Sequence, residues 1–225
     1  MLKIVKKIFW KTVAKNAAPC EEMLAIVKSF KASGKNINVA EIGVDSGATS
    51  EAVVRLLGPE DAYYMFDFKN VTGKLKDKLN KATSARIFEF GNSTRTYDSY
   101  NWSLANLWKG LEDKELFDVV YLDGAHTFAH DGLACCILKK MLKKGGVLLF
   151  DDLYWTIWTS PTVNPTVNPK TKRLYTDEQM KTRQVQLVVD MFMKTDRNFE
   201  EIEEYSSSER AAYRKIGYRL TDLPT

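Results

Sequence analysis

Three aspartates occur where short apolar runs end. Asp123 follows the run Val119–Leu122, and Asp151 and Asp152 follow the run Val147–Phe150. If the two runs are neighbouring parallel strands, their ends lie roughly 5 Å apart, and three carboxylates meet at one edge of a sheet. Such a cluster repels itself unless a divalent cation binds there or one carboxyl group keeps its proton. The pattern predicts a metal site for Mg²⁺ or another divalent cation, built from these three aspartates.

A histidine follows the first aspartate closely. His126 comes three residues after Asp123, and imidazole is a suitable proton acceptor near neutral pH. We therefore predict a catalytic pair in which His126 is the base and Asp123 lies at the reacting centre. Two alternatives stay open: the histidine is structural, or Asp152 caps a turn while Asp123 only hydrogen-bonds a cofactor.

A turn with two glycines follows the first apolar strand run. In Glu41-x-Gly43-x-x-x-Gly47 the glycines allow a ligand to approach the backbone. The spacing departs from the Gly-x-Gly-x-x-Gly of dinucleotide sites, which argues against a pyrophosphate. Asp67 follows the second strand run, where an acid holds the ribose hydroxyls in dinucleotide folds. A cofactor with a ribose but no pyrophosphate fits these residues best.

Strand runs alternate with helical patterns from Asn38 onward, which is typical of a parallel sheet covered on both faces. The predicted strands are Asn38–Ile42, Tyr63–Phe66, Arg86–Phe90, Asp118–Leu122 and Val147–Phe150, followed by an antiparallel pair, Phe199–Tyr205 and Ala211–Leu220. The predicted helices are Thr49–Leu57, Thr72–Lys81, Ser99–Leu111 and Phe128–Leu142. The expected fold is α/β: a doubly wound, mostly parallel seven-stranded sheet with a C-terminal antiparallel pair.

Two signals predict helix ends. The pair Gly145-Gly146 should end the helix that begins at Phe128, because lysines precede it and glycine suits the position past a last turn. Thr176 and Gln179 form a capping-box pattern, which predicts a helix from there to about Lys194.

The residues after the paired aspartates are irregular. Residues 159–169 repeat a Pro-Thr-Val-Asn unit that neither a helix nor an inner strand accepts, so we predict a loop near the carboxyl edge of the sheet. It is either a plain spacer or a segment that closes over a substrate, with Trp155 and Trp158 as apolar walls. Four aromatic residues after the third strand either fill the core or line an acceptor pocket: Tyr97, Tyr100, Trp102 and Trp108.

The N-terminal part has helical patterns. Residues 2–15 place apolar side chains at steps of three and four with lysines on the opposite arc, which indicates an amphipathic helix. It packs on the body or on a second subunit of a homodimer, or it lies on an anionic membrane. A second helix is predicted from Pro19 to Gly34. We divide the chain into an N-terminal helical cover segment, residues 1–36, and one globular domain, residues 37–225.

The composition limits the function classes. The net charge is +4, but the first fifteen residues hold five lysines and no acid, so the rest of the chain is nearly neutral. We expect no nucleic-acid partner, since such proteins usually carry a basic patch on the folded surface. Three cysteines, two of them adjacent, form neither a disulfide framework nor a zinc motif, which indicates a reducing compartment. Without a signal peptide or an apolar run near ~20 residues, we expect a cytoplasmic protein, at most peripheral at the inner membrane surface.

The motifs resemble those of class I methyltransferases that use S-adenosylmethionine. Glu41-x-Gly43-x-x-x-Gly47 looks like their first motif, Asp67 like their ribose acid, and Gly91-Asn92-Ser93 like the turn beside the adenine. The small-molecule O-methyltransferase branch, which includes catechol and macrolide-sugar methyltransferases, is similar in two further stretches, Asp118-Val-Val-Tyr-Leu-Asp123-Gly-Ala-His126 and Gly145-Gly-Val-Leu-Leu-Phe-Asp151-Asp152. The resemblance covers about residues 38–153 and implies a Rossmann-like methyltransferase fold.

The resemblance also implies a role for each matching residue. Gly43 and Thr49 would lie near the methionine portion of the cofactor, Asp67 at the ribose, and the transferred methyl would project toward Asp123. The residues expected at the cofactor are Glu41, Gly43, Val44, Gly47, Thr49, Asp67, Asn92, Ser93 and Asp123, with Asn92 and Ser93 at the base. One departure concerns the proton acceptor: catechol-type enzymes carry a lysine where this chain has His126, and sugar-modifying relatives often carry an acid where it has Ala125.

The expected function is transfer of a methyl group from S-adenosylmethionine to a hydroxyl of a small molecule or glycan, assisted by Mg²⁺. A sugar of a natural product or of a surface polysaccharide is the first expectation for the acceptor, because two neighbouring oxygens can chelate the ion, and a catechol-like phenol is the second. The alternatives are a metal-independent methyltransferase acting on protein or RNA, and a cofactor-binding scaffold without catalysis.

Overall fold

A seven-stranded sheet forms the centre of the molecule, of which the computed structural model describes residues 18–217. Its strands are β1 (Asn38–Ile42), β2 (Ala62–Phe68), β3 (Arg86–Asn92), β4 (Phe117–Leu122), β5 (Leu142–Phe150), β6 (Phe199–Glu201) and β7 (Ala211–Lys215). They lie in the order β3-β2-β1-β4-β5-β7-β6. The first five are parallel, and β7 is antiparallel to both of its neighbours. The predicted doubly wound sheet with its C-terminal antiparallel pair is confirmed.

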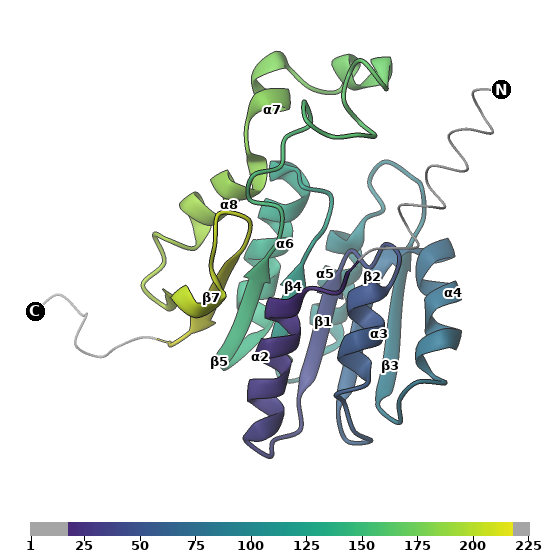
Figure 1. Ribbon diagram of the computed structural model, residues 1–225, viewed down its shortest axis with the longest axis vertical. Helices are drawn as coiled ribbons and strands as arrows, with labels where there is room; N and C mark the ends of the chain where they lie inside the picture. Colours follow the sequence, from purple (N-terminus) through teal and green to yellow (C-terminus); the bar gives the residue numbers. More distant parts are fainter. Residues whose placement is uncertain (1–17, 218–225) are drawn as a thin grey trace, which may run out of the picture.

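Helices cover both faces of this sheet, as Figure 1 shows. They are α2 (Glu21–Ala32), α3 (Ala48–Val54), α4 (Lys69–Leu79), α5 (Tyr100–Gly110), α6 (Phe128–Met141), α7 (Asp177–Lys181) and α8 (Gln184–Phe192). Helices α2, α3 and α4 pack on one face, and α5, α6 and α8 pack on the other. Successive strand residues alternate between the layers: Val39 joins the first and Ala40 the second. Burial on both faces explains why the inner strand runs are mostly apolar, whereas the edge strand β3 carries the exposed Arg86 and Glu89.

The helix predicted over Phe128–Leu142 is present as α6 to within one residue, but the role predicted for Gly145-Gly146 is wrong. The helix stops at Met141, and the pair Gly145-Gly146 lies inside β5 rather than after the last helical turn. The register between β4 and β5 shifts between Phe117 and Val119, so β5 carries extra residues at this point. The glycines serve this irregular stretch of strand, in which Gly145 has a φ of 82°.

The predicted helix from Thr176 to Lys194 is wrong in its length. The capping box at Thr176 is present, but α7 ends after five residues because Thr182 has an extended backbone, with ψ at 137°. A second helix, α8, begins at Gln184 and packs on α6 in the core. The helix predicted for residues 2–15 lies outside the described residues.

Backbone hydrogen bonds continue past the strand ends at the carboxyl edge of the sheet. The amide of Asp123 donates to the carbonyl of Ile42 at 2.9 Å, and the amide of Asp151 donates to that of Leu122 at 3.1 Å. These bonds hold the first residues of the loops after β1, β4 and β5 side by side, in continuation of the parallel strands. The prediction that Asp123 and Asp151 follow adjacent parallel strands is therefore confirmed.

The segment between β5 and α8 rises above this edge (Figure 1). Turns follow Thr159 through the Pro-Thr-Val-Asn repeats, as predicted, and a short 3-10 helix, η1 (Pro169–Arg173), and α7 come after them. Between residues 18 and 217, no helix combines the length and the hydropathy needed to cross a bilayer.

Gly43 is required where β1 meets the loop after β4. Its φ is 85°, a left-handed conformation that side chains disfavour. A Cβ atom added here would lie 1.9 Å from the carbonyl oxygen of Asp123. The glycine therefore permits the close approach of two backbones that carry site residues, whatever a ligand also requires.

Gly43→Ala is expected to lower the free energy of unfolding by more than about 3 kcal/mol, because both the backbone conformation and the overlap with Asp123 oppose a methyl group. Gly73→Ala is the matched control. Gly73 lies inside α4 with no heavy atom within 4 Å of the added Cβ, so alanine should stabilise by about 1 kcal/mol. Urea unfolding of both variants measures the difference, and an equal effect at the two positions would contradict the packing argument.

Candidate active site

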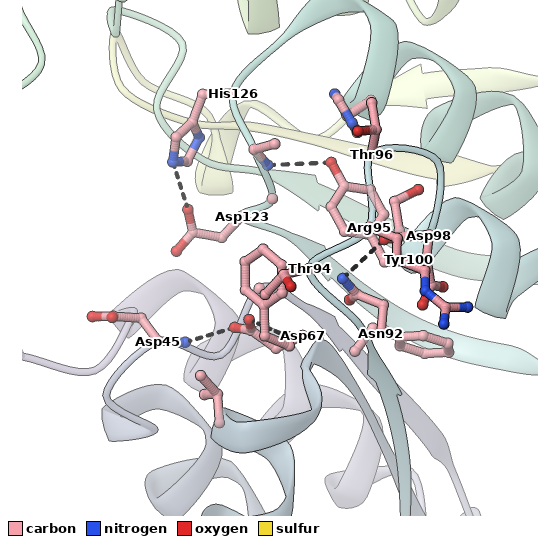
Figure 2. Close-up of a pocket in the computed structure, with 18 of the residues that line it drawn as sticks. Asp45, Asp67, Asn92, Thr94, Arg95, Thr96, Asp98, Tyr100, Asp123 and His126 are labelled. Carbon is pink, nitrogen blue, oxygen red and sulfur yellow. Dashed lines mark hydrogen bonds and ion pairs between the residues drawn. The ribbon is translucent and has the colours of Figure 1, made fainter. Parts of the chain in front are cut away.

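A cleft of about 640 Å³ opens at the carboxyl edge of the sheet. Figure 2 shows its lining, which comes from the loops after all five parallel strands, β1 to β5. Predicted site residues in the lining are Gly43, Asp67, Asn92, Asp123, His126 and Asp152. Residues far apart in the sequence thus meet in one cavity of the size that small-molecule sites have.

Asp123, His126 and Asp152 form a group within this cleft. The Nε2 atom of His126 lies 3.8 Å from a carboxylate oxygen of Asp123 and 3.5 Å from one of Asp152. His126 and Asp152 have φ values of 54° and 58°, so both loops turn sharply at these residues. Such left-handed conformations are costly outside glycine and often occur at functional sites.

The donor atoms of this group suit a divalent cation. One ligand atom from each residue lies within 4.8 Å of the other two. Ligands about 2.1 Å from one ion lie about 3 Å apart at right angles, so a small contraction would let two or three of these atoms reach it. Carboxylate oxygens suit Mg²⁺, and a carboxylate and imidazole set also suits several transition metals.

Asp151, predicted as a third metal ligand, lies outside this group. Its carboxylate accepts a hydrogen bond from the Tyr121 hydroxyl and forms an ion pair with Arg210, whose Nε lies 3.0 Å away. It lines a second, smaller cavity rather than the cleft. The reason is that the chain turns at Asp152, which sends the two neighbouring side chains to different sides of the loop.

Two acids of the cleft, Asp123 and Asp152, have a raised pKa. Enclosure disfavours the charged form of Asp123, and the nearby charges of Asp151 and Asp152 add to this, so its pKa is raised well above the usual value. Enclosure also raises the pKa of Asp152, although His126 opposes the shift. A positive charge bound between these carboxylates would relieve their repulsion.

Asp67 lies on the opposite wall of the cleft, at the end of β2 (Figure 2). One carboxylate oxygen accepts hydrogen bonds from the backbone amides of Val44 at 2.9 Å and Asp45 at 3.2 Å. The other accepts the amide of Phe68 at 2.6 Å. Asp67 therefore ties the turn after β1 to the end of β2, next to the position expected for a ribose.

The end of β3 and the turn after it supply both predicted residues and residues that the sequence did not single out. Asn92 is buried at the cleft wall and donates to the carbonyl of Asp98 at 3.2 Å. The other lining residues of this turn are Thr94, Arg95, Thr96 and Asp98. Ser93 lies outside the lining, and its amide donates to the Asp98 carboxylate at 2.7 Å. A polar run after a strand was the available signal, but it does not say which side chains turn inward.

The second cavity, of about 140 Å³, lies beside the turn after β1. Gly43 and Asp123 line both cavities, so the two cavities are neighbours at the carboxyl edge of the sheet. Val44 and Thr49 line the small one, and the Thr49 hydroxyl accepts a hydrogen bond from the amide of Cys20 at 3.0 Å. Gly47 lines neither cavity; its Cβ would lie 2.5 Å from a Leu75 methyl group. Sequence reasoning did not single out Cys20 or Arg210 for this region.

Buried hydrogen bonds support the loop that carries Asp123 and His126. The Tyr100 hydroxyl donates to Asp131 at 2.5 Å and accepts from the amide of Ala125 at 3.2 Å. A Cβ on Gly124 would lie 2.4 Å from the Asp131 carboxylate, so only glycine fits between them. Of the four predicted aromatics, Tyr100 lines the cleft, whereas Tyr97 is 94% and Trp102 62% exposed.

The remaining predicted site residue, Glu41, is 2% exposed at the end of β1. Its carboxyl group accepts hydrogen bonds from the hydroxyls of Ser50 and Tyr63. Burial raises the pKa of Glu41 to about 8, and the nearby Asp67 adds to the shift. Glu41 therefore carries a proton at neutral pH and stabilises the start of the turn rather than presenting a charge to a ligand.

Glu41 makes the folded protein less stable as the pH rises. Its pKa is about 8 when folded against 4.5 in the reference state, so its contribution is complete below 4.5 and is lost as the pH approaches 8. From about pH 5 to pH 8, the free energy of unfolding should fall in both proteins. The fall should be smaller in Glu41→Gln than in the unchanged protein, by up to about 4 kcal/mol. Urea unfolding at both pH values tests this, and parallel pH dependence would contradict the assignment of a neutral Glu41.

Comparisons with known proteins identify solved structures with the same fold. A protein from Corynebacterium glutamicum has a TM-score of 0.59 and 10% identity, over 91% of this chain and 85% of that one. The O-methyltransferase TomG from Streptomyces achromogenes, involved in tomaymycin synthesis and solved in complex with SAM, has a TM-score of 0.53 and 12% identity, over 89% and 82% of the two chains. MycE, a methyltransferase of the mycinamycin biosynthetic pathway solved with Mg and SAH, has a TM-score of 0.51 and 18% identity, over 85% and 48%.

These similarities define the fold as that of the methyltransferases. The family described as "Methyltransferase domain" matches residues 40–153, just over half of the chain. The chain belongs to this family, which confirms the resemblance seen in its motifs. No curated protein matches the chain.

Proposed function

We propose that the protein transfers a methyl group from S-adenosylmethionine to a hydroxyl oxygen of a small polyhydroxylated molecule or glycan, with a divalent cation bound at the acceptor. The observation that carries this proposal is the convergence of Asp123, His126 and Asp152 beside the Gly43 turn in a chain of the methyltransferase family. S-adenosylmethionine supplies an electrophilic methyl group on a sulfonium. The carboxylates of the cleft favour the positive charge of such a donor.

The two cavities suit the two ends of this cofactor. Asp67 and Asn92 line the large cleft, where they would bind the ribose and the base. Thr49 and Val44 line the small cavity, which would take the methionine end. Asp123 lies at the boundary between them, where the reactive carbon would project. TomG and MycE, which share the fold, were solved with SAM and SAH, in agreement with this cofactor.

His126 is the proposed proton acceptor. In the reaction the sulfur–carbon bond breaks as the oxygen–carbon bond forms, and the proton of the acceptor hydroxyl passes to Nε2 of His126. This nitrogen faces both carboxylates, so the imidazolium that forms would be stabilised by Asp123 and Asp152. The ring of Trp155, 5.0 Å from that of His126, helps to fix the imidazole in this orientation.

Asp123 and Asp152 would hold the cation, which when bound lowers the pKa of an acceptor hydroxyl and fixes its orientation. Both carboxylates face the open cleft, so two neighbouring hydroxyls of an acceptor could approach the same ion. This arrangement favours a sugar over an isolated alcohol. Trp155, beside His126, offers an aromatic surface of the kind on which sugar rings pack.

Labelled S-adenosylmethionine, incubated with Mg²⁺ and a panel of sugars and catechols, tests the function directly. We expect label in an acceptor with neighbouring hydroxyls, loss of transfer on chelation, and its return with added Mg²⁺. Transfer that persists in chelator would reject the cation and favour the metal-independent alternative. Failure to bind S-adenosylhomocysteine in calorimetry would reject the cofactor assignment.

His126→Gln is expected to lower kcat by about 100-fold or more, because it removes the proton acceptor and keeps a polar side chain of similar size. Binding of S-adenosylhomocysteine should stay within about threefold, since the cofactor does not depend on this group. His130→Gln is the comparison variant, and it should have a much smaller effect because His130 instead bonds the Thr127 hydroxyl at 2.9 Å. Equal losses in the two variants would reject His126 as the base.

Asp67→Asn should weaken binding of S-adenosylhomocysteine by about tenfold, because it removes the charged acceptor from the expected ribose position. Asp77→Asn, on the exposed face of α4, is the control for the loss of one charge. Calorimetry of both variants measures the difference. Unchanged affinity in Asp67→Asn would show that the ribose does not bind at the end of β2.

A further inference from the structure

The two neighbouring aspartates after β5 belong to different cavities. Asp152 lines the large cleft and lies 3.5 Å from His126. Asp151 lines the small cavity on the other side of the loop, with a side chain that is 11% exposed. The sequence pattern treats them as equivalent ligands, but the fold gives them different partners.

Both carboxylate oxygens of Asp151 already have partners within the protein. At one oxygen, the amide of Asp152 donates at 2.8 Å and Arg210 Nε lies at 3.0 Å. At the other, the hydroxyl of Tyr121 donates and Arg210 Nη2 donates at 3.4 Å. A cation at this carboxylate would have to compete with the ion pair to Arg210.

Arg210 is itself held on two sides. It lies just before β7, and its Nη1 also contacts Glu22 of α2 at 3.2 Å. The guanidinium thus bridges the first described helix to the carboxyl edge of the sheet. Its planar, two-pronged shape suits simultaneous contacts with both oxygens of Asp151 better than an ammonium group would.

We propose that Arg210 is a positioning residue: it holds Asp151 as its counter-ion, so that Asp123 and Asp152 alone supply the carboxylate ligands of the cation. This inference rests on the cation in the proposed function and names its ligands. Charge supports it, because two carboxylates neutralise a divalent ion while the third is neutralised by the guanidinium. Without Arg210, three carboxylates would share one edge and repel one another.

Mn²⁺ binding to the full chain, measured by electron paramagnetic resonance with S-adenosylhomocysteine present, tests the assignment. Asp152→Asn should raise the Kd for Mn²⁺ by at least about tenfold, because it removes a ligand. Asp151→Asn should also weaken binding, because it exposes the positive charge of Arg210 to the ion. The double variant Asp151→Asn with Arg210→Gln removes both members of the pair without changing the net charge, and its Kd should return to within about threefold of the unchanged protein.

The double variant separates the two models. If Asp151 were a ligand, adding Arg210→Gln would leave Mn²⁺ binding as weak as in Asp152→Asn, and the proposal would be overturned. Unchanged Mn²⁺ affinity in Asp152→Asn would overturn it as well. A third outcome is an unchanged protein that binds no Mn²⁺ and still transfers methyl groups in the presence of chelator. That result would reject the cation and this inference, but it would leave the proposed methyl transfer in place.

A second measurement avoids any variant that fails to fold. Crystals of the unchanged protein soaked in Mn²⁺ locate the ion by its anomalous scattering. The proposal expects oxygens of Asp123 and Asp152 within about 2.3 Å of the ion and Asp151 still paired with Arg210. An Asp151 oxygen at ligand distance would overturn it.

Discussion

Repulsion between like charges at the carboxyl edge of the sheet is the constraint on which the site depends. Five acids end or follow β1, β2, β4 and β5, and the parallel register brings them to one edge: Glu41, Asp67, Asp123, Asp151 and Asp152. Five negative charges this close would oppose folding. The structure relieves the repulsion with a different set of partners for each acid, and those partners divide the edge into a cleft and a smaller cavity.

Three of the acids are satisfied by the protein itself. Glu41 keeps its proton among hydroxyl groups, Asp67 accepts backbone amides of the turn after β1, and Asp151 pairs with Arg210. The other two, Asp123 and Asp152, face His126 across the open cleft, and their pKa values are raised by enclosure. The proposed cation site thus lies where the protein's own groups neutralise the carboxylates least. This is the reason to expect a bound cation there rather than at any other acid of the edge.

Local signals predicted the order of the elements and failed where packing overrides them. Most strand runs are apolar because both faces of the sheet are covered, so they were visible without coordinates, although the edge strand β3 includes the exposed Arg86 and Glu89. Gly145-Gly146 misled because glycine and lysine suit a helix end as well as an irregular strand, and only the shifted register with β4 decides between them. The break at Thr182 was invisible for a similar reason: the apolar pattern of α8 continues that of α7, and the extended backbone between them depends on tertiary packing.

The sequence by itself determined which chemical groups reach the carboxyl edge, because parallel strands end in known positions and the residues that follow them are read directly. It therefore predicted the fold, the family, and Asp123, His126 and Asp152 as neighbours. Only the tertiary structure decided which carboxylates face one another, since side-chain direction depends on left-handed turns at His126 and Asp152 that no local pattern marks. It also brought in Arg210, which lies 59 positions from Asp151 and whose contact depends on the antiparallel pairing of β7 with β5.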